Sequence, residues 1–177
     1  SKSSLFQVRL KFFRRFLFIA LKRQKLLESF SISPSHKKIL WINIAAPSLG
    51  DSLMDLSSRV LLNNRQVDLF TDKKNADLYM NDSIFSSIFV DKKEVKENDY
   101  DLVIIDSYST RSISIKADII PKVKFVGMFG YFNGPEVNRV LFSFHRMNSL
   151  LGYPKTENEI NTFAKSYLKI SSKDQKK

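Results

Sequence analysis

The residue best placed for chemistry in this chain is Asp51, which follows the segment 38–50. An apolar run over 39–44 predicts a buried strand, and a short Pro/Ser/Gly loop separates it from an amphipathic helix that begins near 51. In open α/β sheets, such a strand, loop and helix start build ligand sites at strand carboxyl ends. A carboxylate there could act as a general base. Aspartate is also a preferred N-cap, so the residues alone leave both interpretations open.

Further polar residues flank this loop and follow a later strand. Ser48 and Ser52 could donate hydrogen bonds to a polar acceptor, although serine beside a helix start is more often a cap. The segment 100–107 predicts a fully apolar strand, and Asp106 and Arg111 stand at its end. This acid and base could grip a polar acceptor together; the alternative is a helix cap plus a surface ion pair.

The elements that position these residues alternate between strand and helix patterns. Near-continuous Val/Ile/Leu runs between helices indicate a mainly parallel sheet covered on both faces, hence a Rossmann-like three-layer α/β/α domain. Right-handed crossovers place Asp51, Asp106 and the 128–133 loop, with its aromatic Phe129, Tyr131 and Phe132, at one sheet edge. We expect strands at 39–44, 66–71, 87–90, 100–107 and 124–128, and helices at 51–63, 75–80, 136–152 and 156–170.

Composition excludes several kinds of site. The chain has no cysteine and only two histidines, His36 and His145, so disulfides, thiolate metal sites and histidine-rich metal sites are excluded. The loop 45–50 lacks the glycine pattern of dinucleotide binders and the lysine of the Walker motif, which disfavours NAD and ATP. We therefore expect neither a metal nor a cofactor. The spacing around His145 favours a packed or surface histidine over a catalytic one.

Positive charge is concentrated at the start of the chain. The net charge is +11, yet residues 1–38 hold 10 Lys/Arg against one acid, Glu28, which leaves the remainder nearly neutral. A nucleic-acid-binding core would carry its own basic face, so nucleic acid is not an expected partner. No apolar run in this region approaches the roughly 20 residues of a membrane-spanning helix.

The segment 5–30 has the period of an amphipathic helix, with an aromatic apolar side opposite a basic side. Such a helix suits the surface of an anionic membrane. The alternative is a helix that packs its apolar side on the domain and leaves its charges solvated. The basic residues of the membrane-surface interpretation are Lys11, Arg14, Arg15, Lys22 and Lys25.

Four motifs in order, ILWINIAAPSLGDSL, VDLFTDKKNADLYMNDSIFSSIFV, YDLVIIDSYSTRS and NSLLGYP, resemble the N-terminal half of the ADP-heptose glycosyltransferases (glycosyltransferase family 9, lipopolysaccharide heptosyltransferases). The resemblance covers about residues 38–154. It implies the acceptor-side domain of a two-domain GT-B enzyme that transfers a sugar from a nucleotide sugar, with inversion, to a lipid-linked or lipopolysaccharide-core glycan. It implies that Asp51 is the base. The acceptor contacts would be Ser48, Gly50, Ser52, Asp106 and Arg111.

Two departures qualify this resemblance. The family pattern continues into a second, donor-binding domain, so we expect a half-enzyme, a split-gene subunit or a truncated chain. It would need a donor-domain partner for activity, or would self-associate. The family also often carries a histidine where Asn138 stands, and His145 does not take over that role. The competing hypothesis is a non-catalytic Rossmann-like binding or scaffold module at the membrane surface.

The expected organisation has three parts: a basic amphipathic helix and linker over 1–37, the Rossmann-like acceptor-side domain over 38–154, and a helical segment with a tail over 155–177. The resemblance and the basic helix together predict a cytoplasmic protein, peripheral to the inner face of the membrane.

Overall fold

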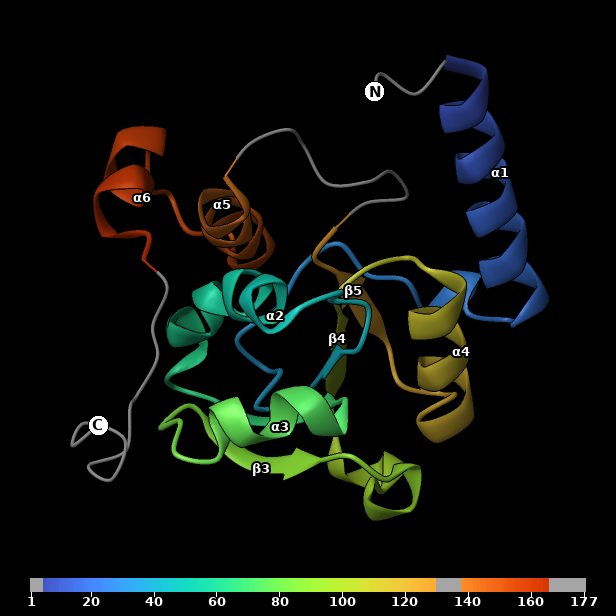
Figure 1. Ribbon diagram of the computed structural model, residues 1–177, viewed down its shortest axis with the longest axis horizontal. Helices are drawn as coiled ribbons and strands as arrows, with labels where there is room; N and C mark the ends of the chain where they lie inside the picture. Colours follow the sequence, from blue (N-terminus) through green and yellow to red (C-terminus); the bar gives the residue numbers. More distant parts are fainter. Residues whose placement is uncertain (1–4, 130–137, 166–177) are drawn as a thin grey trace.

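A parallel five-stranded sheet forms the centre of the protein, in a computed structural model that describes residues 5–129 and 138–165 (Figure 1). All four strand pairings are parallel, and the strand order is β3-β2-β1-β4-β5. This confirms the predicted α/β class with a Rossmann-like sheet. The strands are β1 (Lys38–Asn43), β2 (Gln66–Thr71), β3 (Phe85–Phe89), β4 (Leu102–Ile105) and β5 (Phe125–Gly127).

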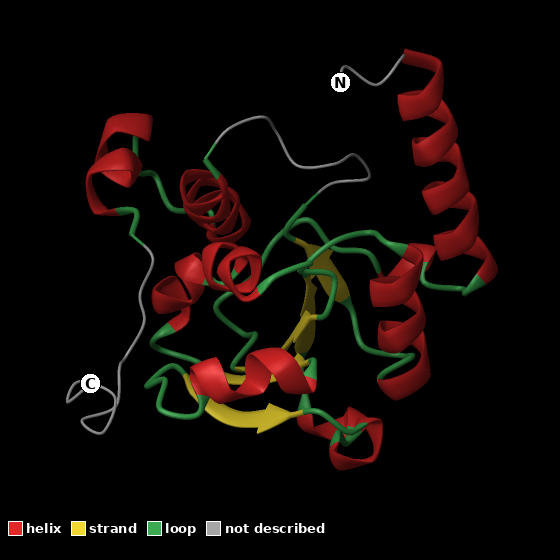
Figure 2. Ribbon diagram, viewed as in Figure 1, coloured by secondary structure: helices red, strands yellow, loops and turns green. Residues whose placement is uncertain are grey.

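Helices cover both faces of this sheet (Figure 2). One face carries α2 (Leu49–Asp55), α3 (Lys73–Tyr79) and α5 (Arg139–Leu151), and α6 (Glu157–Phe163) packs on α5. The other face carries α4 (Thr110–Ile119) and the end of α1 (Leu5–Leu21). The result is the three-layer arrangement that the alternating strand and helix patterns predict.

Alternating side chains of each strand supply two separate cores, because successive residues of a strand point to opposite faces. Trp41, Leu69 and Ile104 point into the core under α2, α3 and α5. Leu40 and Val103 point the other way, into the core under α4. Burial on both faces explains why these strands are apolar throughout rather than alternately polar.

The predicted helix over 51–63 divides into two elements. Helix α2 ends at Asp55, and a 3₁₀ segment, η2 (Ser57–Leu62), continues the chain. The Ser57 hydroxyl donates to the Met54 carbonyl at 2.7 Å, and the guanidinium of buried Arg59 donates to the Leu56 carbonyl at 3.0 Å. These side chains compete for the backbone groups of the last turn, which explains the early end of the α-helix.

The predicted helix over 5–30 is also shorter than expected. Helix α1 ends at Leu21, because Arg23 adopts a left-handed backbone conformation (φ 57°), and a short 3₁₀ turn, η1 (Lys25–Leu27), follows. Helix α5 begins at Arg139 instead of 136, the first residue of its predicted span, and residues 166–170 of the last predicted helix lie outside the described residues. In the part of the chain that the structure describes, no helix is long and apolar enough to cross a membrane.

Candidate functional site

The candidate site lies where the winding of the sheet reverses, at the carboxyl ends of β1 and β4. These two strands are neighbours, but α2 follows β1 on one face of the sheet and α4 follows β4 on the other. The connections therefore separate at this point, which is where open α/β sheets form a ligand crevice. The β1–α2 loop, residues 44–48, leads from this edge of the sheet into the start of α2 (Figure 1).

Asp51 occupies the third position of α2 rather than its N-cap. The N-cap is Ser48, whose hydroxyl accepts a hydrogen bond from the Asp51 backbone N–H at 3.1 Å. The same hydroxyl donates to Oδ2 of Asp51 at 2.6 Å. The cap interpretation of Asp51 is therefore wrong, whereas the cap interpretation of Ser48 is confirmed. The Asp51 carboxylate keeps 21% of its side-chain surface exposed, so a ligand can reach it.

Arg139, the first residue of α5, holds two carboxylates of α2 at once. Its guanidinium donates to Asp51 Oδ1 at 2.6 Å and, through two nitrogens, to the two oxygens of Asp55 at 2.9 and 2.6 Å. Neither Arg139 nor Asp55 was predicted as a site residue. The available signal was indirect: α5 follows the last strand, so its first turn had to begin at the same sheet edge.

Asp55 is the titratable member of this group. Burial raises its pKa to about 7, and the hydrogen bonds and charge of Arg139 oppose that shift. On its other side the Arg139 guanidinium lies 5.5 Å from the ring centre of Phe129, which stacks on Phe142. Two carboxylates and an aromatic ring therefore fix the guanidinium, and Arg139 in turn fixes the direction of the Asp51 carboxylate.

Asp106 supports the β1–α2 loop, and protein donors occupy all four acceptor positions of its carboxylate. Its Oδ2 accepts from the backbone N–H groups of Ile44 and Ala45 at 2.8 and 2.6 Å. Its Oδ1 accepts from the Ser107 N–H and the Ser112 hydroxyl, both at 2.7 Å. Burial raises the pKa of Asp106, while these four hydrogen bonds act against the shift. We therefore reassign Asp106 from a predicted acceptor contact to the group that positions the β1–α2 loop.

Ser52 also faces the core rather than the crevice. It is fully buried, and its hydroxyl donates to Oδ1 of Asn43 at 2.8 Å and lies 3.1 Å from the hydroxyl of Tyr79. Its predicted contact with an acceptor does not fit this position. Gly50, by contrast, is exposed, and a Cβ built on it would meet only the Ser48 hydroxyl, at 3.8 Å. A methyl group at position 50 would therefore fit without a clash.

Two cations hold the β1–α2 loop from the outside. Arg111 donates to the Ile44 carbonyl at 2.9 Å and to Asp72 at 2.7 Å, so it pairs with Asp72 and not with Asp106. Its side chain remains 60% exposed. The ammonium of Lys74 contacts the carbonyls at 46 and 47, both at 3.3 Å. Arg111 and Arg139 are both paired with carboxylates, so the site edge carries cations and anions side by side.

The remaining candidates lie apart from Asp51 or beyond what is described. His145 contacts Asn161 of α6 at 3.1 Å, which confirms the packed or surface interpretation. Asn138 caps α5 by accepting from two backbone N–H groups, at 2.9 and 3.4 Å. Tyr131 and Phe132 fall outside the described residues. Within residues 5–129 and 138–165, no group of three or more His, Asp or Glu side chains could hold a metal ion.

The five basic residues predicted for a membrane surface have different surroundings. Lys25 forms an ion pair with Glu28, and the ammonium of Lys22 lies 5.9 Å from the ring centre of Phe18. Lys11 and Arg15 are partly buried, and burial lowers the pKa of each. Arg14 is exposed. The predicted basic side is therefore not one uniformly solvated face.

Comparison with known proteins identifies no relative of this chain. No protein-family model, no curated protein and no solved structure matches it. The similarity to ADP-heptose glycosyltransferases thus rests on the four sequence motifs alone. What the structure adds is the Rossmann-like fold and the geometry around Asp51.

Proposed function

We propose that this domain is the acceptor-binding half of an inverting glycosyltransferase similar to the ADP-heptose glycosyltransferases. Its acceptor would be a lipid-linked or lipopolysaccharide-core glycan, modified at the cytoplasmic face of a membrane. A second domain, on this or another chain, would bind the nucleotide sugar. The observation that carries the proposal is the Asp51 carboxylate: it is partly exposed, it lies in the first turn of the helix that follows β1, and Ser48 and Arg139 orient it.

Asp51 would serve as the general base. Each carboxylate oxygen has two acceptor sites, so Asp51 can accept a hydrogen bond from an acceptor hydroxyl while it keeps Ser48 and Arg139. As the hydroxyl oxygen bonds to the anomeric carbon, its proton moves to Asp51. The bond to the nucleoside diphosphate breaks, and the leaving group takes the electron pair. Attack from the face opposite the leaving group inverts the anomeric configuration.

Two exposed cations beside the β1–α2 loop bear on the chemistry of the acceptor. Arg111 and Lys74 hold the loop through its carbonyls, yet both side chains remain exposed at the crevice. Guanidinium and ammonium groups in this setting favour phosphate or carboxylate groups. A phosphate or carboxylate on the acceptor would therefore pair with Lys74 or compete with Asp72 for Arg111.

The first prediction tests Asp51 by exchanging its carboxylate for an amide. With a donor domain supplied, Asp51→Asn should lower turnover by roughly 10²–10⁴-fold, the usual loss for a general base. Acceptor affinity should change only a few-fold, because the amide oxygen still accepts hydrogen bonds. Release of the nucleoside diphosphate measures turnover, and isothermal titration with the acceptor glycan measures affinity.

The matched control is Asp118→Asn, the same chemical change at an exposed residue of α4 that pairs with Lys92. It should leave both measurements unchanged. If Asp51→Asn turned over at the wild-type rate, Asp51 would not be the base.

One feature of the site favours the alternative, a non-catalytic binding module. The Asp51 carboxylate already accepts from Ser48 and Arg139, so it also belongs to the polar network that holds the start of α2 against α5. Acceptor binding without transfer, in the presence of every candidate donor domain and sugar nucleotide, would support that alternative.

A further inference from the structure

Among the described residues, the end of helix α1 is the part that packs on the hydrophobic core of the domain. Ile19 is the one buried residue of the helix, and Phe18 packs beside it on the core under α4. In Figure 1 the rest of α1 runs along the side of the molecule, away from the sheet. Most of the helix therefore has the domain on one side and solvent on the other.

Specific polar contacts fix the direction of this helix. Directly after α1, the buried Gln24 side chain donates to the Pro121 carbonyl at 3.2 Å and accepts from the Lys116 ammonium at 2.5 Å. A few residues later, Glu28 accepts from the Tyr108 hydroxyl at 2.7 Å. Both anchors hold the chain that leaves α1, so the helix is held at a set orientation to the sheet.

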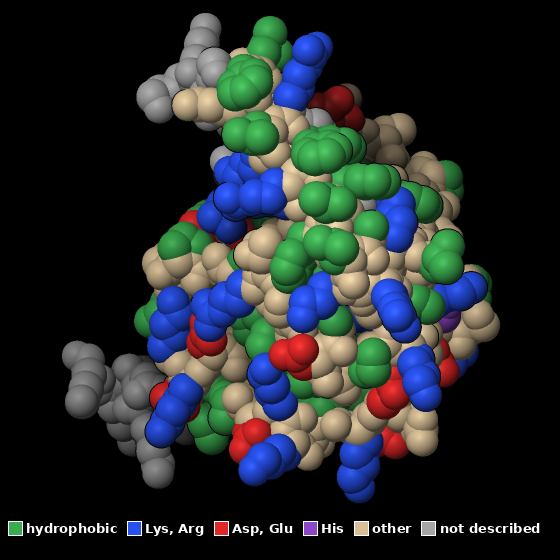
Figure 3. Space-filling model, turned by 90° about the vertical axis from the view of Figure 1, so that its right-hand side faces the viewer, with side chains coloured by type: hydrophobic (Ala, Val, Ile, Leu, Met, Phe, Trp, Pro, Cys, Tyr) green, Lys and Arg blue, Asp and Glu red, His purple; other side chains and the backbone are tan. Residues whose placement is uncertain are grey.

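The outward side of α1 is a stripe of large apolar side chains, which we call the apolar stripe. Its residues are spaced by four, three, four and four positions, the spacing of a single helix face. They are Phe6, Leu10, Phe13, Leu17 and Leu21, with 73, 56, 62, 46 and 70% of their surface exposed. Figure 3 shows hydrophobic side chains gathered over this helix at the top of the molecule. Apolar residues that gather in this way, rather than singly, mark an interaction surface.

Cations border the apolar stripe. At 100° per residue, Arg9 lies on one side of the stripe and Arg14 on the other, and both are exposed. No acidic residue precedes Glu28 in the sequence. Burial, and then the charges of Arg15 and Arg14, lower the pKa of Lys11, so this end of the protein already holds like charges close together.

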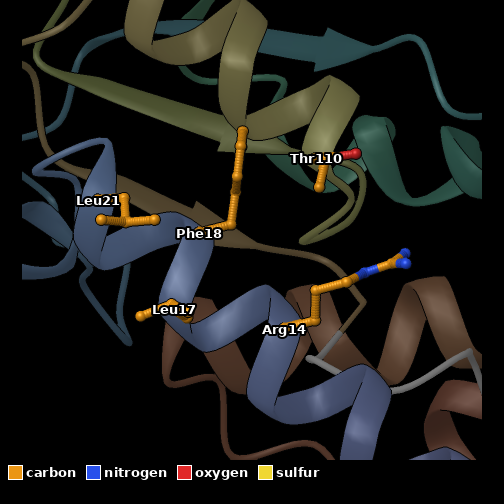
Figure 4. A pocket seen from close by; sticks show the side chains of 5 residues that line it. All are labelled: Arg14, Leu17, Phe18, Leu21 and Thr110. Atoms are coloured by element: carbon orange, nitrogen blue, oxygen red, sulfur yellow. The ribbon is translucent and has the colours of Figure 1, made fainter.

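An open groove continues the stripe toward the candidate site. It lies between α1 and the first turn of α4, has a volume of about 420 Å³ and is lined by Arg14, Leu17, Phe18, Leu21 and Thr110. Figure 4 shows Phe18 reaching from α1 toward α4, with Arg14 on the side where Thr110 lies. Thr110 belongs to the turn that follows Asp106, so the groove adjoins the carboxyl edge of the sheet.

We propose that α1 docks this protein on an anionic lipid bilayer. The apolar stripe enters the boundary between headgroups and acyl chains, Arg9 and Arg14 contact lipid phosphates, and the groove faces the same surface. The carboxyl edge of the sheet is thereby held beside the membrane.

Charge favours an anionic bilayer over a second copy of the chain as the partner of the apolar stripe. A second copy would bring another helix with four cations and no acid against the first, whereas an anionic bilayer neutralises both arginines. The inference does not rest on the proposed sugar transfer, because a protein without enzymatic activity can still bind a bilayer through α1.

The second prediction tests this surface by flotation of the full chain with vesicles. Wild-type protein should float with vesicles of phosphatidylcholine and phosphatidylglycerol and bind pure phosphatidylcholine at least about tenfold more weakly, because each basic residue near an anionic surface contributes on the order of 1 kcal/mol. The double variant Leu10→Asp/Phe13→Asp should lose flotation. Arg9→Gln/Arg14→Gln should keep the stripe but reduce the preference for the anionic lipid.

Matched controls place the same changes on exposed residues elsewhere. Met80→Asp/Val90→Asp introduces two carboxylates at side chains that are 70 and 46% exposed, and Lys73→Gln/Lys96→Gln removes two exposed cations. Both should float like the wild type, and circular dichroism should confirm that every variant is folded. Equal binding to both lipids, or unchanged flotation of Leu10→Asp/Phe13→Asp, would overturn the proposal. So would a wild-type dimer that this variant dissociates and that does not float.

Discussion

The carboxyl edge of the sheet and helix α1 differ in how their polar and apolar side chains are placed. At the edge, charged groups meet several protein partners each: the buried Asp106 accepts four hydrogen bonds, and the partly buried Arg139 holds two carboxylates. On α1, large apolar side chains face solvent, and the buried contacts lie near the end of the helix. One region uses its polar groups to build the fold, and the other leaves its apolar groups outside it.

This difference indicates which groups in each region are available to a ligand or a partner. A carboxylate whose oxygens all serve the protein, such as Asp106, sets geometry for others. A partly exposed one with remaining acceptor sites, such as Asp51, is available to a ligand. An apolar stripe that the domain does not cover requires a partner, since burying it within the fold would have been favourable.

The largest expected effect, and the third prediction, is on stability at the edge. Asp106→Asn replaces one acceptor oxygen with an amide donor, and in the better of its two orientations this donor still faces the Ser107 N–H, so at least one backbone N–H loses its acceptor. We expect the free energy of unfolding to fall by on the order of 3 kcal/mol, measured in urea. The counterpart on α1, Leu10→Asn, should change it by less than about 0.5 kcal/mol. Equal losses in the two variants would mean that α1 is part of the cooperative core, and the contrast would fail.

An effect of comparable size that depends on pH is expected from Asp55, whose pKa burial raises to about 7. Between about pH 4 and pH 7 the folded protein holds a proton on Asp55 that the unfolded chain has released. The contribution of Asp55 to stability therefore decreases as the pH rises through this window. As the fourth prediction, Asp55→Asn should remove this titration and gain roughly 2–4 kcal/mol relative to wild type from pH 4 to pH 7.

Thermal or urea unfolding of both proteins at several pH values measures that difference. The exposed pair partner Asp118, changed to Asn, provides the control and should show no such trend. A constant difference between Asp55→Asn and wild type would show that Arg139 keeps Asp55 ionised throughout. The edge would then be a permanent ion-pair network.

Local patterns in the sequence predicted the elements of the fold well. The strand β2 (Gln66–Thr71) has the bounds predicted from its apolar run, and β1 is shifted by one residue. The helix α4 was not predicted as a separate element, because Ser112 and Lys116 are polar residues at buried positions and break the apolar period. Lys116 is buried against Gln24, which precedes it by 92 residues in the chain, and no local pattern indicates such a contact.

The candidate site was predicted only in part, for the same reason. The strand and loop pattern placed Asp51 at the sheet edge, but its partner Arg139 lies 88 residues further along the chain. A contact of that separation leaves no periodic trace in one sequence. Asp106 was placed at the correct edge, yet its burial beneath the loop depends on how the loop folds back over β4, so its supporting role became visible only in three dimensions.

The smallest expected effect concerns two glycines and tests whether a ligand lies over Gly50. Gly50 lies within α2 with space around its Cα, so Gly50→Ala should raise the free energy of unfolding by up to about 1 kcal/mol. Gly152 caps α5 at φ 66°, so Gly152→Ala should lower it by roughly 1 kcal/mol through backbone strain alone. In this fifth prediction, urea unfolding should show stability changes of opposite sign for the two variants. Titration with the acceptor glycan should distinguish them a second time, by affinity. Gly50→Ala should weaken acceptor binding although it stabilises the fold, because a ligand over the β1–α2 loop needs the space that the methyl group fills. If Gly50→Ala bound the acceptor as tightly as wild type, the ligand would lie away from α2, on the side of Arg111 and Lys74.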